Sequence, residues 1–179
     1  EKTWMDTFEY PNQPNHPPLT GISWTEANQH CAKAGKRLCS TEEWELGCGG
    51  TNRWSFPYGN EYIPEMCAIL QSTPVLSGQS WACQSPLGLQ DMVGSVWEWT
   101  SSPLDATVLK PNPNSVLYEI RGGSWYTDER KGTCTPSAGY PLTDGNATHP
   151  DLGFRCCRGE TLKLETPTMP SDTCPTNMR

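Results

Sequence analysis

The nine cysteines constrain this chain of 179 residues more than any other feature of its sequence. They form no Cys-x-x-Cys pair and are accompanied by only three histidines, whereas structural zinc sites take their ligands from closely spaced Cys and His pairs. Disulfides are therefore the expected use, which indicates an extracytoplasmic location: periplasmic, cell-surface or secreted. The odd count leaves at least one thiol over, or one bond to another chain, and Cys174 is the candidate.

Composition predicts a single loop-rich domain and excludes two classes of partner. The chain contains 17 Pro and 16 Gly but only 35% hydrophobic residues, so its core must depend on eight Trp and on cross-links. A net charge of −7 offers no basic surface to phosphate backbones, and nucleic acid is not an expected partner. No apolar run approaches the roughly 18 residues that cross a bilayer, so no membrane span is expected.

Two segments carry the capping box of a helix start, in which a Ser and a Glu three residues later bind each other's backbone N–H. The pairs are Ser23 with Glu26 and Ser40 with Glu43, and the helices that they predict cover 24–34 and 41–48.

Short strands are expected near the N-terminus, at 116–125 and at 153–158. In the last of these, Cys156 and Cys157 are neighbours and point to opposite faces, so they need different partners. A more local disulfide is expected between Cys67 and Cys83, which bracket a loop rich in Ser, Gln, Pro and Gly. Closing that loop of about 15 residues would stabilise the fold by about 3 kcal/mol.

The stretch 87–100, LGLQDMVGSVWEWT, places an acid between two tryptophans. In an extended segment Trp97 and Trp99 share one face and Glu98 points to the other. An acid buried there costs several kcal/mol unless a partner is present.

Two partners for Glu98 fit the residues of this stretch. Asp91 lies seven residues earlier, and oxygen ligands from a short, kinked segment suit Ca²⁺. In the alternative, Asp91 caps a turn and Glu98 pairs with an arginine such as Arg121 or Arg155. The residues alone favour this second interpretation, because carboxylates near turns are common.

Five segments, in this order, resemble the formylglycine-generating, sulfatase-modifying factor family, a variant of the C-type lectin-like fold. They are GISWTEANQHCAKAGKRLCSTEEWELGCGG, FPYGN, LGLQDMVGSVWEWT, IRGGSW and LGFRC, and together they cover roughly residues 5–158. The resemblance implies an α+β fold with two short helices packed on small antiparallel sheets and several disulfides. The expected domain is 1–158, followed by a Pro/Thr-rich tail at 159–179.

The resemblance also implies a calcium site in the stretch 87–100, and it reverses the preference stated above. Its ligands would be the side chains of Asp91 and Glu98 and the carbonyls of Gly94 and Val96. A second calcium site of the family begins with an Asn-Ile pair, which is Ala68-Ile69 here and lacks the side-chain oxygen. Calcium is the expected cofactor, and the second site is not expected to survive.

The family pattern implies a set of disulfides as well. Cys31 pairs with Cys156, and Cys48 with Cys134, which leaves Cys39 and Cys157 as an additional pair beside Cys67 and Cys83.

The catalytic residues of the family are where this chain departs from it. Formylglycine-generating oxidases bind copper(I) through two thiolates, at positions occupied here by Thr127 and Gly132. Cys134 is a single thiol and is better used in a cystine. A copper site of two cysteines is therefore not expected.

The sequence thus predicts a non-catalytic, calcium-stabilised binding or scaffold domain. Its ligand, a protein or a glycan, is expected on loops 126–151, 52–64 and 101–117, because long loops in a compact domain are usually functional. The candidate contact residues are Tyr126, Asp128, Glu129 and Arg130.

Two rival functions remain at this point. One is a noncanonical oxidoreductase or modifying enzyme that uses Asp128, Glu129 or a residual thiol with a metal. The other is a structural domain of a larger surface assembly, joined through Cys174 or the C-terminal tail.

Overall fold

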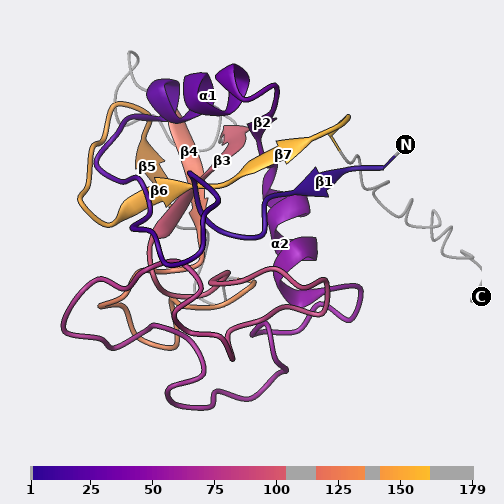
Figure 1. Ribbon diagram of the computed structural model, residues 1–179, viewed down its shortest axis with the longest axis vertical. Helices are drawn as coiled ribbons and strands as arrows, with labels where there is room; N and C mark the ends of the chain where they lie inside the picture. Colours follow the sequence, from indigo (N-terminus) through magenta and orange to yellow (C-terminus); the bar gives the residue numbers. More distant parts are fainter. Residues whose placement is uncertain (1, 104–115, 136–141, 162–179) are drawn as a thin grey trace, which may run out of the picture.

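The computed structural model describes residues 2–103, 116–135 and 142–161 as two helices and seven short strands joined by long connections (Figure 1). The helices are α1 (Trp24–Lys33) and α2 (Thr41–Gly49). The strands are β1 (Trp4–Met5), β2 (Arg37–Leu38), β3 (Trp97–Pro103), β4 (Leu117–Arg121), β5 (Leu142–Asp144), β6 (Leu152–Phe154) and β7 (Cys156–Arg158). Cys174 and most of the expected tail lie outside the described residues, as do parts of loops 101–117 and 126–151.

Both helices begin where the capping boxes predict. The side chains of Ser23 and Ser40 each accept a hydrogen bond from the backbone N–H three residues on, and the Glu at that position binds back to the cap. Each helix ends within one residue of its predicted end. Among the described residues, neither helix is long and apolar enough to cross a membrane.

The strands form two sheets, one antiparallel and one mixed. The first has the order β1-β7-β2, and the second the order β5-β4-β3-β6. The expectation of small antiparallel sheets holds except at β6, which pairs with β3 in parallel. The chain from β3 to β6 passes through β4 and β5, and this long connection allows the parallel return.

Two predicted strands are shorter in the structure. The strand expected at 116–125 stops at Arg121, because Gly122 and Gly123 have positive φ and turn the chain away. The strand expected at 153–158 divides at Arg155 into β6 and β7, which belong to different sheets. Arg155 is therefore the residue at which the chain passes from one sheet to the other.

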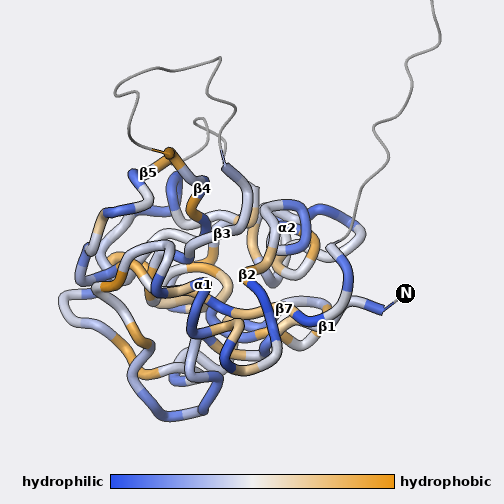
Figure 2. Tube along the Cα trace, turned by 90° about the horizontal axis from the view of Figure 1, so that it is seen from above, coloured by the Kyte–Doolittle hydropathy of each residue, from blue (hydrophilic) through white to orange (hydrophobic). Residues whose placement is uncertain are grey.

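Two clusters of buried side chains make up the core. One contains Trp44, Met92 and Val93 with the cystines of α2 and the connection 50–96, and the other contains Trp99, Leu152 and Phe154 against α1. Figure 2 shows hydrophobic positions toward the middle of the molecule and hydrophilic ones along the outer loops. The connection between α2 and β3 forms the end of the molecule opposite α1 (Figure 1).

Four disulfides cross-link the fold, in the pairs that the sequence analysis expected. The pairs are Cys31–Cys156, Cys39–Cys157, Cys48–Cys134 and Cys67–Cys83. As expected for neighbours in a strand, Cys156 and Cys157 bond to different partners.

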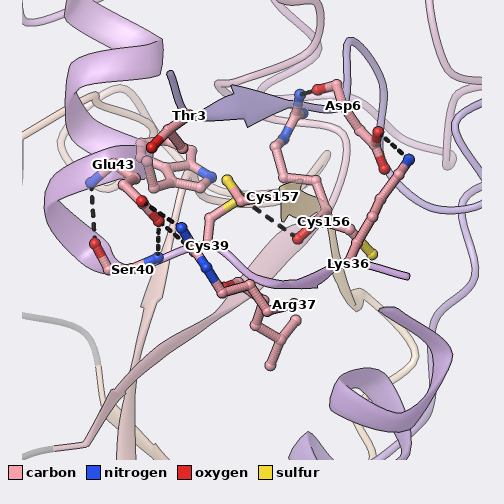
Figure 3. The surroundings of a disulfide bond; sticks show 12 residues. Thr3, Asp6, Lys36, Arg37, Cys39, Ser40, Glu43, Cys156 and Cys157 are labelled. Carbon is pink, nitrogen blue, oxygen red and sulfur yellow. Dashed lines mark hydrogen bonds and ion pairs between the residues drawn. A yellow bond between two sulfur atoms is a disulfide. The ribbon is translucent and has the colours of Figure 1, made fainter. Parts of the chain in front are cut away.

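Polar contacts surround the Cys39–Cys157 bond (Figure 3). The Arg37 guanidinium donates to both carboxylate oxygens of Glu43, each at 2.7 Å. Lys36 pairs with Asp6 on the other side of the bond. The short strand β2 is thus fixed at its side chains as well as by pairing with β7.

Candidate functional site

A buried ion pair lies at the centre of the stretch 87–100. Glu98 in β3 is 1% exposed, and Arg155 between β6 and β7 is 0% exposed. Arg155 donates to both Glu98 oxygens, from Nη2 to Oε1 at 2.7 Å and from Nε to Oε2 at 2.8 Å. Trp44 adds a hydrogen bond from Nε1 to Oε2 at 2.7 Å. The arginine partner considered for Glu98 is thus present and is Arg155, while Arg121 pairs with Glu45 and Glu119.

The Arg155 guanidinium also binds three main-chain carbonyls. It donates to Asp6 and Thr7 in the N-terminal segment, each at 3.1 Å, and to Gln90 at 3.0 Å. One side chain therefore connects the N-terminal segment, the 87–100 stretch and the junction between the two sheets.

Two further acids, Glu9 and Asp91, are buried beside this ion pair. Glu9 is 0% exposed and accepts a hydrogen bond at Oε2 from the Ser77 hydroxyl at 2.8 Å. Asp91 is 1% exposed and accepts one at Oδ2 from the backbone N–H of Gly78. Because Ser77 and Gly78 are consecutive, they hold the two carboxylates close together.

Several oxygens of this cluster have no hydrogen-bond partner. They include Glu9 Oε1, Asp91 Oδ1 and Ser95 Oγ. The Ser95 hydroxyl lies close enough to interact with the Glu9 carboxylate but forms no well-aligned hydrogen bond with it. Since a buried polar atom without a partner costs roughly 1–3 kcal/mol, these oxygens distinguish the cluster from the rest of the buried polar groups.

The cluster contains more acidic groups than basic ones. Glu9, Asp91 and Glu98 bring three carboxylates, and Arg155 is the cation that they share. Burial raises the pKa of Glu9 to about 7, and the charge of Asp91 adds to this effect against that of Arg155. Burial likewise raises the pKa of Asp91 to about 6, against the hydrogen bond from Gly78. The surroundings of these two acids in the folded chain therefore disfavour their ionised forms.

The four expected calcium ligands fit a cation unequally. Asp91 fits, because its Oδ1 atom is buried without a partner. Gly94 has φ of 76° and lies at a sharp turn, two residues before Val96. Glu98 does not fit, because Arg155 and Trp44 bind both of its oxygens. Within the described ranges, no three His, Cys, Asp or Glu side chains are arranged as a metal cluster.

The positions expected for copper thiolates hold no sulfur. The Thr127 hydroxyl donates to the carbonyl of Ser124 at 2.8 Å and accepts from its N–H at 3.0 Å, closing a turn. Gly132 is packed so closely that an added Cβ would lie 2.8 Å from Cγ2 of Ile69. Cys134 is bonded to Cys48. The polar turn and the tight packing occupy the space that two thiols would need.

The candidate contact residues of the loop face lie within five consecutive residues, Tyr126 to Arg130. Tyr126 is 55% exposed and packs edge-on against Trp125, with ring centroids 5.0 Å apart. Asp128 and Arg130 form an exposed ion pair at 3.5 Å. The turn thus presents an aromatic ring beside exposed charges.

The sequence matches a known protein family. Residues 3–160 match the family model described as the sulfatase-modifying factor enzyme 1-like domain. The chain belongs to this family.

Relatives named as inactive and relatives named as enzymes have similar sequence identity to this chain. The chain is 32% identical over 161 residues to the inactive C-alpha-formylglycine-generating enzyme 2 of Bos taurus, covering 79% of the chain and 50% of the relative. It is 32% identical over 177 residues to the formylglycine-generating enzyme of Thermomonospora curvata, covering 81% and 56%. The chain therefore spans about half the length of these relatives.

A solved structure shows the same fold. The crystal structure of CarF superposes with a TM-score of 0.59 at 21% identity, covering 80% of this chain and 67% of that one. The loop-rich α+β fold expected from the sequence is confirmed.

Glu9 is the site residue that the sequence analysis missed. It lies 82 positions before Asp91 in a segment taken for a strand and a connection, where a lone acid gives no periodic signal. The available hint was an acid between two aromatic residues, Phe8 and Tyr10, in a segment that the fold buries.

Proposed function

We propose that this sulfatase-modifying factor domain is non-catalytic and acts outside the cytoplasm as a binding or scaffold module. The proposal rests on the absence of cysteine at the two copper positions and on the oxidation of the described cysteines to disulfides. Thr127 and Gly132 stand where the oxidases have copper thiolates, and all eight cysteines of the described residues are in disulfides. Copper(I) prefers soft thiolate ligands, so the oxidase chemistry lacks its metal site here.

The relatives are consistent with this proposal, although their names alone do not decide it. An inactive paralogue and an active enzyme have the same identity to the chain. What separates the two functions is therefore the chemistry at positions 127, 132 and 134. The four disulfides support an oxidising, extracytoplasmic environment.

The proposed ligand surface is the loop face that carries Tyr126, Asp128, Glu129 and Arg130, together with loop 52–64. An exposed aromatic ring beside a carboxylate and a guanidinium offers both stacking and charge-assisted hydrogen bonds, which suit a peptide or a saccharide. Such groups recognise a ligand without needing a metal.

A paired binding and turnover assay tests the proposal. The disulfide-intact chain is applied to glycan and peptide arrays, and it is separately incubated with copper(I), oxygen and a cysteine-containing peptide substrate. The expected result is saturable binding that Tyr126→Ala and Arg130→Ala weaken at least tenfold, with no oxidation of the peptide.

Exposed residues away from this face provide the control. Lys33→Ala, at the end of α1, should bind as the unmodified chain does. Copper-dependent turnover without any array ligand would overturn the proposal and favour the noncanonical enzyme.

A further inference from the structure

We infer that Glu9 and Asp91 together bind one calcium ion in the interior, with Glu9 taking the place that the family pattern gives to Glu98. This inference is independent of the loop face and of any ligand bound there. It concerns the cation that completes the buried cluster described above.

The charge count of the cluster favours a cation. Glu98 is neutralised by Arg155, with its two oxygens bound at 2.7 and 2.8 Å. Glu9 and Asp91 then remain as two buried acids without a cation of their own. Burying an uncompensated charge is strongly unfavourable, and one divalent cation cancels both charges at once.

The unused oxygens belong to side chains that interact with one another, since Glu9 interacts with both Asp91 and Ser95. Ser77 binds one oxygen of Glu9 and Gly78 binds one oxygen of Asp91, so that each carboxylate keeps its second oxygen free. The Ser95 hydroxyl, buried and without a hydrogen bond, lies beside Glu9. Two carboxylates and a hydroxyl are thus held near each other by contacts that leave their ligand atoms available.

The backbone beside these side chains turns sharply. Asp91, Gly94 and Ser95 all have positive φ, at 56°, 76° and 57°, so the chain turns repeatedly within five residues. A Cβ at Gly94 would lie 2.2 Å from the carbonyl oxygen of Ala68, so the two backbones approach as closely as glycine permits. Sharp turns that present carbonyls next to carboxylates are typical of calcium loops.

The donor set selects the kind of cation. Its side chains offer oxygen alone, which suits hard cations and not copper(I) or zinc. Irregular geometry from separate segments suits calcium, because magnesium demands a near-ideal octahedron.

Glu98 has a different part in this arrangement. Its oxygens accept N–H groups from Arg155 and Trp44, and the guanidinium would repel a cation placed against them. Glu98 therefore positions Arg155, which in turn holds the N-terminal segment that carries Glu9.

Calorimetry on the disulfide-intact chain tests this assignment. The protein is stripped with EGTA, and calcium binding is measured by isothermal titration and by the shift in melting temperature. One site per chain is expected, and Glu9→Gln and Asp91→Asn should each weaken calcium affinity at least tenfold. Both variants remove surplus negative charge, so the metal-free protein should melt no lower than the unmodified chain.

Two further variants separate the competing ligand sets. Glu42→Gln changes an exposed acid on α2 and should leave calcium binding unaltered. Glu98→Gln should lower the melting temperature with and without calcium but keep the calcium-induced rise.

Specific outcomes would overturn the inference. Unchanged calcium affinity in Glu9→Gln would remove Glu9 from the site even if Glu98→Gln does not fold. A calcium response abolished by Glu98→Gln but retained by Glu9→Gln would restore the ligand set implied by the family. Neither result bears on the loop face, whose binding is measured on separate arrays.

Discussion

At the scale of single residues, Arg155 connects three parts of the domain. It neutralises Glu98, binds carbonyls of Asp6, Thr7 and Gln90, and stands where the chain leaves one sheet for the other. A buried guanidinium with these partners is difficult to replace, because Glu98 and three main-chain carbonyls depend on it.

Replacing Arg155 by Met should lower the free energy of unfolding by about 3–5 kcal/mol, because Glu98 is left buried without its cation. The double variant with Glu98→Met should recover only part of this loss, since the three carbonyls still lack a donor. Urea unfolding of both variants measures the two values. Arg158→Met, on the exposed end of β7, is the matched control, and an equal loss in that variant would contradict the prediction.

Gly132 stands at one of the two positions where the oxidases of the family have a copper thiolate. Replacing Gly132 by Ala should destabilise the fold by about 1–3 kcal/mol, because the new Cβ meets Cγ2 of Ile69 at 2.8 Å. Thermal unfolding beside the neighbouring exposed change Lys131→Ala provides the comparison. A Gly132→Ala variant as stable as Lys131→Ala would show that a thiol could be accommodated there.

Residues differ in how far the sequence alone determines their surroundings. The sequence indicates that Glu98 needs a partner. It does not show that β3 and the β6–β7 junction are neighbours, and that contact decides between calcium and an arginine. Glu9 could not be assigned at all, because its partners Ser77 and Asp91 come from a distant connection with no periodicity.

At the scale of elements, local chemistry determined the helices better than the strands. Both capping boxes fix where α1 and α2 begin, since each requires only four consecutive residues. The strands depend on distant partners, and so β4 ended early and the last strand divided between two sheets.

The strand β7 carries two disulfides whose effects should not add. Cys31–Cys156 spans 125 residues and Cys39–Cys157 spans 118, but each shortens the ring that the other closes to about ten residues. Removing one pair by Cys→Ala should therefore cost about 2–3 kcal/mol, whereas removing both should cost about 6–7 kcal/mol. Denaturant unfolding of the three variants measures this difference.

The local bridge Cys67–Cys83 serves as the control for that comparison. Its loss should cost about 3 kcal/mol and add to the loss of either other pair, because its ring does not run through β7. A single-bridge loss at β7 as large as the combined loss would contradict the ring argument.

At the scale of the whole molecule, five ordered segments indicated the family, and the family pattern together with the local pair Cys67 and Cys83 predicted the disulfides found in the structure. Those pairs use all eight cysteines of the described residues. The loops that would contact a ligand are the part that the sequence specifies least, because they lack periodicity.

Thiol titration of the unreduced, denatured chain should detect at most one free cysteine, Cys174. The same sample should bind no stoichiometric copper(I), since the described cysteines are oxidised. Two or more titratable thiols together with bound copper would contradict the non-catalytic proposal.

The position of β7 between β1 and β2 has a consequence for biosynthesis. A ribosome releases Cys31 and Cys39 long before their partners exist, and Cys39 precedes Cys157 by 118 residues. Neither sheet can be completed until the last strands have emerged, so the early cysteines are exposed to each other and to wrong pairing. Maturation of this domain should therefore depend on a disulfide isomerase, and the two disulfides of β7 should form last.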